Sequence, residues 1–422
     1  MKFITTIALL LLGTTAVMGA VSQTTITDSS FIQAPQVVVN PSEEKEGLFS
    51  GAYVDTVFFS PADTSETLYV WTINWNFETQ ATKSIIRRAI DASTLEAKGE
   101  DVTLDIQIKS KVGVMGQAGI GYLGFPSIRD DGEDTPNQLY FSLLVANATS
   151  DDQPTDVKIT ENTDKNTSYF FNNVWFADNA FWMFYTDFDM GTGDEKTLYI
   201  QAIKTDGTLM YDAPVKVATL DNPAGTTVPI AGPNKDKDAS TIYVVYKDYE
   251  TKTTMQTTMS ISNGQVDEPT QLVTDTDTVV YYPDGMITAA EVSGVVLLRQ
   301  EFEEDDNELE EDLKVYYNGA TSKPETLDIE APEDYQSPVI QSGTYQDGFS
   351  VVVKFYGQQD VEYVVKAFKT DGSELLDQKT LLKSQGNVAF FQDAAGALWA
   401  AIVDYDFGTG KLSKGYLGKV LE

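Results

Sequence analysis

A short unit recurs along the chain, in which an aromatic residue stands between two polar residues that are mostly carboxylates. Its copies occupy residues 76–78, 187–189, 248–250, 301–303 and 404–406. Successive side chains of a β-strand point to opposite faces, so the two polar groups share one side and the ring takes the other. The unit therefore predicts strand ends at which a ring packs inward while the polar groups remain in water.

Two copies continue into the pattern Asp-x-Asp-x-Gly-Thr-Gly, over residues 187–193 and 404–410. Glycines let the backbone curl so that carboxylate and carbonyl oxygens converge, which suits Ca²⁺ and its six to eight oxygen ligands. The pattern lacks the third carboxylate and the distal Glu of an EF-hand loop, so carboxylates that only end a strand in water are the alternative. The candidate calcium ligands are Asp187, Asp189, Asp194, Asp404 and Asp406.

The absence of histidine and cysteine excludes several reaction types. Nucleophilic catalysis by Ser-His-Asp or Cys-His, zinc sites that contain histidine, and imidazole general bases all require these residues. Any catalysis would have to use carboxylates, tyrosine, lysine or bound cations. We identify no catalytic residues and no cofactor-binding residues, and Ca²⁺ is the one cofactor that the sequence suggests.

The net charge of −35 limits the partners of the chain. Nucleic acids and anionic membranes carry the same sign of charge and are repelled. The simplest explanation of such a charge is that it keeps the protein soluble or adapts it to a saline environment. A functional acidic surface is the alternative, and it depends on where the carboxylates lie.

The first 20 residues have the features of a secretory signal peptide. Lys2 precedes an apolar run that reaches Leu12, and small residues follow up to Ala20. Such a run is typical of a signal peptide and is too short to span about 30 Å of hydrocarbon. We therefore expect residues 1–20 to be removed, and residues 21–422 to form one secreted, extracellular domain without membrane insertion. Without disulfides, its stability must come from a large packed core.

Turn signals reveal an internal repeat. Asp-Gly and Asn-Gly turns place glycines at positions 207, 264, 319 and 372, at spacings of 57, 55 and 53 residues. Alternating apolar strands flank these turns, which is the sequence pattern of a β-hairpin. Residues 84–92 resemble a helix when taken alone, but their alignment with the repeat predicts a strand.

Two further strand-like runs precede each hairpin, which gives four strands per unit and predicts propeller blades. The predicted blades are residues 51–104, 110–161, 168–219, 226–274, 278–328, 335–382 and 386–421. The last unit lacks an outer strand, and residues 31–41 resemble the missing one. The sequence thus predicts an all-β, seven-bladed β-propeller of four-stranded antiparallel blades, closed by the N-terminal strand at residues 31–41. An open solenoid of β-units is the alternative.

The carboxylates gather in the loops expected between the second and third strands of the blades. These windows are residues 75–84, 129–138, 186–197, 246–254, 300–314, 355–362 and 404–412, and they hold 24 of the 64 carboxylates. In an up-and-down blade these loops share one face, so an acidic face is expected. Residues 301–312 contain nine carboxylates, and their mutual repulsion predicts a mobile, solvated insertion.

The repeat and its latch-type closure resemble the β-propeller superfamily over essentially the whole mature chain. No subfamily matches, because the dipeptides of WD repeats and the arginine triad and boxes of sialidases are absent. The Asp-x-Asp-x-Asp-Gly loop of integrin-type propellers is only partly present, at Asp187 and Asp404. The resemblance implies a fold and no activity, since propellers host many functions.

Two functions fit these observations. The first is a secreted, non-catalytic binding or structural protein whose acidic face binds a protein, a carbohydrate or cations. The alternative is a carboxylate-based glycoside hydrolase or lyase in the central channel. Acids expected on the first strands of the blades could serve it, for example Asp55, Asp178, Asp284 and Glu291. The sequons at Asn147 and Asn166 predict N-glycans if the host is eukaryotic.

Overall fold

The computed structural model describes a chain built from β-strands and turns. The described residues are 36–39, 53–62, 66–76, 79–111, 117–132, 135–192, 195–222, 230–233, 240–248, 253–274, 279–280, 285–288, 295–305, 308–317, 325–326, 336–345, 348–356, 361–369, 373–384, 387–392, 398–406 and 411–421. Every regular element in these ranges is a strand, as the sequence predicts for an all-β protein. No helix in the described part of the chain is long and apolar enough to cross a membrane. The predicted signal peptide lies outside the described residues.

Two compact units make up the chain, namely residues 1–183, 201–214 and 386–422, and residues 184–200 and 215–385. In the first unit, the first sheet has the order β2 (Tyr53–Pro61), β3 (Thr67–Asn76), β4 (Ala81–Asp91), β5 (Val102–Leu104). The second sheet has the order β6 (Gln117–Gly119), β7 (Tyr122–Asp130), β8 (Asn137–Val145), β9 (Thr155–Lys158). The third sheet, β10 (Thr167–Ala177), β11 (Ala180–Asp189), β12 (Glu195–Lys204) and β13 (Val215–Asn222), has strands in both units.

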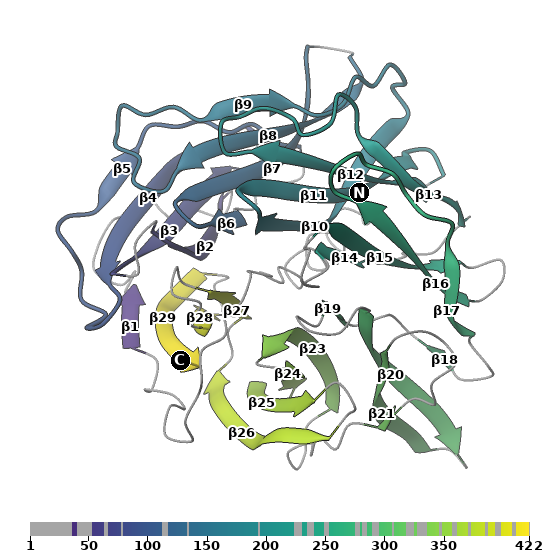
Figure 1. The fold of residues 1–422 in the computed structure, drawn as a ribbon. Helices are drawn as coiled ribbons and strands as arrows, with labels where there is room; N and C mark the ends of the chain where they lie inside the picture. Colours follow the sequence, from purple (N-terminus) through teal and green to yellow (C-terminus); the bar gives the residue numbers. More distant parts are fainter. Residues whose placement is uncertain are drawn as a thin grey trace. The chain divides into compact units, whose positions relative to one another are not determined.

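The second unit holds three more sheets (Figure 1). The fourth consists of β14 (Ile230–Pro233), β15 (Thr241–Asp248), β16 (Thr253–Ser260) and β17 (Thr270–Thr274). The fifth consists of β18 (Val279–Val280), β19 (Gly285–Thr288), β20 (Val295–Asp305), β21 (Glu308–Tyr317) and β22 (Glu325–Thr326). The sixth consists of β23 (Gln336–Tyr345), β24 (Gly348–Tyr356), β25 (Val361–Lys369) and β26 (Glu374–Ser384).

The N-terminal strand pairs with the C-terminal strand. β1 (Gln36–Val39) lies antiparallel to β29 (Lys411–Leu421), with Gln36 opposite Leu417 and Val37 opposite Tyr416. Their sheet has the order β1, β29, β28 (Leu398–Asp406), β27 (Asn387–Gln392). β2 contacts β27, β28 and β29, so this sheet packs beside the first sheet within the first unit.

The first and second sheets are held together by a hydrophobic cluster. Side chains that alternate along β3, β4, β7 and β8 meet the segment that joins the two sheets. The cluster consists of Trp71, Ile73, Ile85, Leu104, Ile106, Ile108, Leu123, Phe125, Leu144 and Ala148. Each large apolar side chain buried in this way contributes about 1.5–3 kcal/mol, so the joining segment is part of the core and not a free linker.

The densest acidic run, which the sequence predicts as a mobile, solvated insertion, contains paired strands. Its described residues lie in β20 and β21, which pair antiparallel with Glu301 opposite Asp312, Glu303 opposite Glu310 and Asp305 opposite Glu308. The apolar segments of the same two strands extend the pairing toward the sheet, with Val296 opposite Tyr317. Strand pairing begun by these segments outweighs the repulsion expected between like charges in directly opposite positions.

Candidate functional site

One end of the second sheet carries a group of charged side chains around a tyrosine, the β7–β9 cluster. Its members are Arg129, Asp131, Tyr140, Asp156, Lys158 and Glu161. The strand register places them together, because Tyr140 lies opposite Lys158 and Arg129 lies opposite Gln138. Leu123 and Leu144 occupy the far end of the same strands and belong to the hydrophobic cluster. Strand alternation thus gives this face an apolar end, which packs on the first sheet, and a polar end.

Arg129 fixes the tyrosine ring. Its guanidinium carbon lies 4.0 Å from the centre of the Tyr140 ring. Nη1 of Arg129 donates to Oδ2 of Asp156 at 2.8 Å. Ser142 supports both groups, since its Oγ accepts from Nη2 of Arg129 at 3.4 Å and donates to Oδ1 of Asp156 at 2.5 Å. A guanidinium held at two points cannot swing away, and the ring beneath it keeps one orientation.

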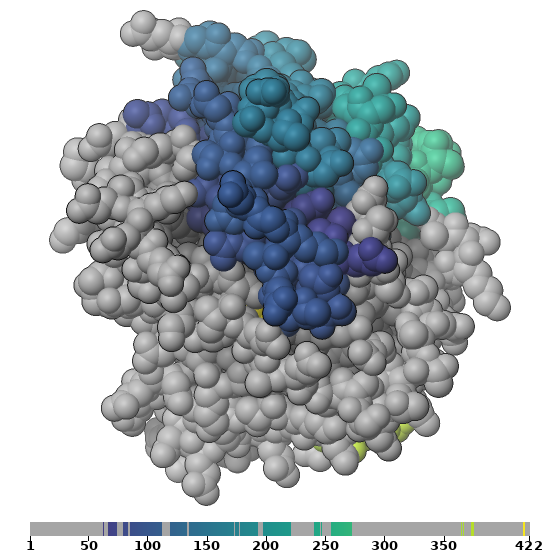
Figure 2. Space-filling model, turned by 90° about the vertical axis from the view of Figure 1, so that its left-hand side faces the viewer, coloured from purple at the N-terminus to yellow at the C-terminus, as the bar shows by residue number. Residues whose placement is uncertain are grey.

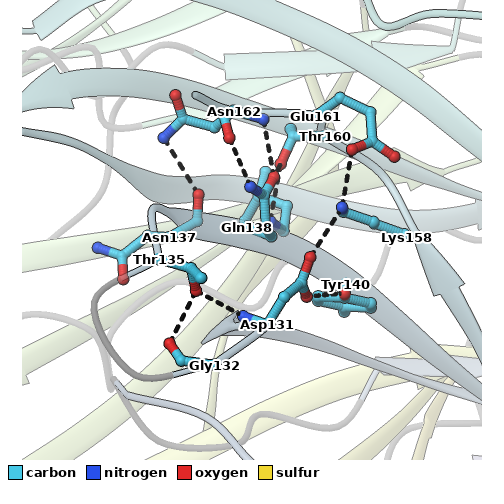
Figure 3. A network of polar contacts seen from close by, with 11 residues as sticks. Asp131, Gly132, Thr135, Asn137, Gln138, Tyr140, Lys158, Thr160, Glu161 and Asn162 are labelled. Carbon is cyan, nitrogen blue, oxygen red and sulfur yellow. Dashed lines mark hydrogen bonds and ion pairs between the residues drawn. The ribbon is translucent and has the colours of Figure 1, made fainter. Parts of the chain in front are cut away.

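The tyrosine hydroxyl and a lysine share one carboxylate (Figure 3). The hydroxyl of Tyr140 donates to Oδ1 of Asp131, and Nζ of Lys158 donates to Oδ2 of Asp131 at 2.9 Å. Lys158 also binds Oε2 of Glu161 at 2.7 Å. The hydrogen bond from Tyr140 and then that from Lys158 lower the pKa of Asp131, whereas burial and then Asp131 raise the pKa of Tyr140. At neutral pH Asp131 is therefore an anion and Tyr140 a neutral hydroxyl.

Neutral amides next to the cluster hold the connection between the second and third sheets (Figure 3). Oε1 of Gln138 accepts from the Asn162 amide at 2.8 Å and from the Thr160 hydroxyl at 3.1 Å. Nε2 of Gln138 donates to the Asn162 carbonyl at 2.7 Å, and Nδ2 of Asn162 donates to the Asn137 carbonyl at 3.1 Å. Protein groups thus occupy both ends of the Gln138 amide, which gives this residue a positioning role.

The pKa directions in the cluster limit the catalytic roles that Asp131 and Tyr140 can take. Glycoside hydrolysis needs one carboxylic acid that stays protonated through a raised pKa. Asp131 does not meet this requirement, because its pKa is lowered. Proton abstraction by Tyr140 would need a lowered pKa, and its pKa is raised. What the cluster offers is a fixed aromatic ring with charged hydrogen-bonding groups around it.

The candidate calcium ligands are only partly described. Oδ1 of Asp189 accepts the amides of Gly191 at 2.8 Å and Thr192 at 3.3 Å, so this carboxylate closes the turn after β11. Asp187 raises the pKa of Tyr199, after the larger effect of burial. Asp194 lies outside the described residues, and the side chains of Asp404 and Asp406 in β28 lie outside them too. Within the described part of the chain, no three carboxylates gather to hold a metal ion.

The acids suggested for a central channel do not form a pair among the described residues. Asp178 lies in the turn between β10 and β11, exposed and with a φ of 51°, so its expected place on a first strand was wrong. Asp and Asn adopt this left-handed conformation more readily than other non-glycine residues, which lets Asp178 and Asn179 form the turn. Asp55 lies in β2 opposite Asn74, and its side chain is outside the described part. Asp284 and Glu291 are also outside it.

Both sequon asparagines are exposed, Asn147 in the turn after β8 and Asn166 just before β10. The β7–β9 cluster itself was missed by the sequence reasoning. A signal was present, because Gln138, Tyr140 and Ser142 alternate with Leu139 and Phe141 along one strand. That alternation marks a face that is not wholly apolar.

No family model and no curated protein matches the chain. Solved structures do match it. An ulvan lyase of polysaccharide lyase family PL25, bound to -[GlcA(1-4)Rha3S]-, has a TM-score of 0.50 at 11% identity, over 95% of this chain and 98% of the lyase. The polysaccharide lyase Uly1 gives 0.49 at 11% identity, over 95% and 100% of the two chains.

The β-propeller domain of the trilobed protease from Pyrococcus furiosus gives a TM-score of 0.45 at 10% identity, over 87% of this chain and 94% of that domain. Identities this low concern the fold alone. The described part of the chain is all-β, and the fold is similar to that of the PL25 ulvan lyase.

Proposed function

We propose that this chain is a secreted seven-bladed β-propeller that binds an uncharged polysaccharide through the β7–β9 cluster without cleaving it. The observation that carries the proposal is the Tyr140 ring, held by Arg129 and hydrogen-bonded to Asp131. Small-molecule sites combine aromatic surface with a few precisely placed polar groups. A tyrosine supplies both an apolar body and a polar tip.

The seven-bladed architecture is supported by two independent features. The turn glycines recur every 53 to 57 residues in the sequence. The described strands form seven hydrogen-bonded sheets, and six of these sheets have four strands. The pairing of β1 with β29 supplies the strand that a closing blade would need. Closure would remove exposed strand edges, which invite aggregation.

The choice of a polysaccharide rests on the cluster and on the similar fold of proteins that act on polysaccharides. One of these, the ulvan lyase, is bound to a carbohydrate ligand and matches along almost its whole length. The two cations of the cluster, Arg129 and Lys158, are already paired with Asp156, Asp131 and Glu161. Because the chain carries a net charge of −35, we infer that the ligand is rich in hydroxyl groups and not anionic.

A polysaccharide lyase or glycoside hydrolase is the second candidate, and the full-length likeness to the ulvan lyase favours it. At this cluster, the lowered pKa of Asp131 opposes its use as a general acid, and the raised pKa of Tyr140 opposes its use as a base. Prolonged incubation with the bound polysaccharide separates the two functions. New reducing ends or unsaturated sugar products would indicate cleavage, and an unchanged chain length supports binding alone.

Calcium binding at Asp187, Asp189, Asp194, Asp404 and Asp406 and N-glycans at Asn147 and Asn166 remain proposals. The acidic loops support the first and the exposure of both asparagines supports the second. Secretion rests on the N-terminal sequence. Expression in a eukaryotic secretory host, followed by N-terminal sequencing and glycosidase treatment, tests secretion and glycosylation together.

The binding proposal is tested by calorimetric titration with neutral glucans, mannans and galactans beside uronic and sulfated polysaccharides. We expect binding to one neutral class, weakened about tenfold or more in Tyr140→Ala, which corresponds to about 1.4 kcal/mol. Tyr122→Ala is the matched control, because Tyr122 is the first residue of β7 and Arg129 lies near the other end of that strand. Equal weakening in both variants, or no binding by the parent protein, would reject the proposed site.

A further inference from the structure

Two polar side chains on β7 point into the layer between the first and second sheets. Ser127 and Arg129 are two residues apart on one strand and therefore share a face. Phe125 precedes them on that face and belongs to the hydrophobic cluster with Trp71 and Ile108. Ser127 is fully buried, and the side chain of Arg129 is only 18% exposed. Both residues thus carry polar atoms at the edge of an apolar core.

One polar atom in each of these side chains has no protein partner. Among the described residues, Oγ of Ser127 and Nε of Arg129 are both buried without a hydrogen bond. The other guanidinium nitrogens of Arg129 are used, since Nη1 binds Asp156 and Nη2 binds Ser142. Rotation of the side chain to satisfy Nε would break those two bonds. Burial of two such groups is costly, and buried polar groups are almost always hydrogen-bonded to protein or water.

The hydrogen-bonding chemistry of the two atoms suits one small bridging molecule. A water oxygen forms hydrogen bonds of about 2.9 Å with polar atoms on two sides. Nε of Arg129 can only donate, whereas the Ser127 hydroxyl donates or accepts. A water molecule accepts from Nε and satisfies Ser127 in either direction. A cation would be repelled by the guanidinium, and an anion would face the Asp156 carboxylate behind it.

We propose that a buried water molecule bridges Oγ of Ser127 and Nε of Arg129 between the first and second sheets. Buried waters typically make about three hydrogen bonds and belong to the structure as firmly as a side chain. This water completes the hydrogen bonding of the Arg129 guanidinium, whose other two nitrogens bind Asp156 and Ser142. Its position depends on the fold alone and is independent of any polysaccharide.

A high-resolution crystal structure of the whole protein is the direct test. The expected result is a solvent peak within about 3 Å of both Oγ of Ser127 and Nε of Arg129, which is lost in Ser127→Val. A well-defined layer with no peak there, or a Ser127 hydroxyl bonded to a protein oxygen, would overturn the proposal.

Side-chain NMR gives an independent test in solution, because the chain has only four arginines. We expect the Nε–H signal of Arg129, assigned by Arg129→Lys, to show magnetisation transfer from a long-lived water. Arg88 is the internal control, since its Nε already donates to Asp101 at 2.8 Å. Transfer to Arg88 and not to Arg129 would contradict the bridge.

Thermal stability supplies a third readout. Without the water, Ser127→Ala removes an unsatisfied hydroxyl and leaves the melting temperature equal or higher. With the water, the same change removes one of its ligands and the melting temperature falls. An unchanged or raised melting temperature would therefore count against the proposal.

Discussion

Gly124 lies where the second sheet has no room for a methyl group. A Cβ built at this position falls 2.1 Å from Cζ and 2.6 Å from Cε1 of the Phe141 ring. Ordinary contact needs about 3.4 Å or more, so Gly124→Ala requires the ring to move by more than 1 Å. The ring is pinned, because Phe141 is fully buried and its centroid lies 5.2 Å from that of Phe181. The clash therefore cannot be relieved by a rotamer change at the surface.

The magnitude follows from two opposing effects. Overpacking of a dense core costs about 1–3 kcal/mol, and a pinned aromatic ring places Gly124→Ala at the upper end. Replacing glycine also reduces the entropy of the unfolded chain, which raises the free energy of unfolding by about 0.4–1 kcal/mol. We expect a net loss of about 2 kcal/mol in the free energy of unfolding.

Urea unfolding followed by the fluorescence of the five tryptophans measures this loss. The midpoint should fall while the slope m stays constant, because the surface exposed on unfolding is unchanged. Gly132→Ala is the matched control, since its nearest heavy atom is Cγ2 of Thr135 at 3.8 Å. A Gly124→Ala protein within about 0.5 kcal/mol of the parent would refute the packing argument, as would an equal loss in Gly132→Ala.

Three further predictions concern the ends of the chain, a turn and the acidic loops. Deletion of residues 31–41 should lower the melting temperature strongly, because β29 loses its partner β1, and retained stability would argue against a closed ring. The Asp206 carboxyl accepts hydrogen bonds from the Thr208 hydroxyl at 2.6 Å and from the Thr208 backbone amide, and these bonds lower the pKa of Asp206. The stabilisation by the ionised Asp206 is therefore present above the ordinary Asp pKa and is lost as the pH falls through the lowered value. In an NMR titration, Thr208→Val should raise the Asp206 pKa toward that ordinary value, and an unchanged pKa would contradict the assigned cause. If the loops at Asp187 and Asp404 bind Ca²⁺, a calcium chelator should lower the melting temperature, and no shift would exclude a stabilising site.

The strands were predictable because their signals are local. The helix-like segment at residues 84–92 is the strand β4, as its place in the repeat predicted. The predicted turn at Asp206-Gly207 is present, with a φ of 82° at Gly207 and its amide bonded to the Lys204 carbonyl at 2.9 Å. Glycine adopts this left-handed conformation without a steric penalty, so its position in the sequence reports the turn directly.

The candidate site was not predictable, because its contacts join distant residues. Arg129 meets Asp156 across 27 residues, and the pairing register of β7, β8 and β9 decides that they meet. The turn at Asp178 was hidden because it forms without glycine. The pairing of β20 with β21 was not expected from the sequence, because the charge of their acidic residues obscured the apolar segments that pair the two strands.

We propose that the Tyr140 face of the second sheet binds an uncharged polysaccharide. Calorimetric titration of that polysaccharide into the parent protein, Tyr140→Ala and Tyr122→Ala is the decisive experiment. We expect saturable binding by the parent and by Tyr122→Ala, and about tenfold or greater weakening in Tyr140→Ala. Undiminished binding by a correctly folded Tyr140→Ala protein would contradict it.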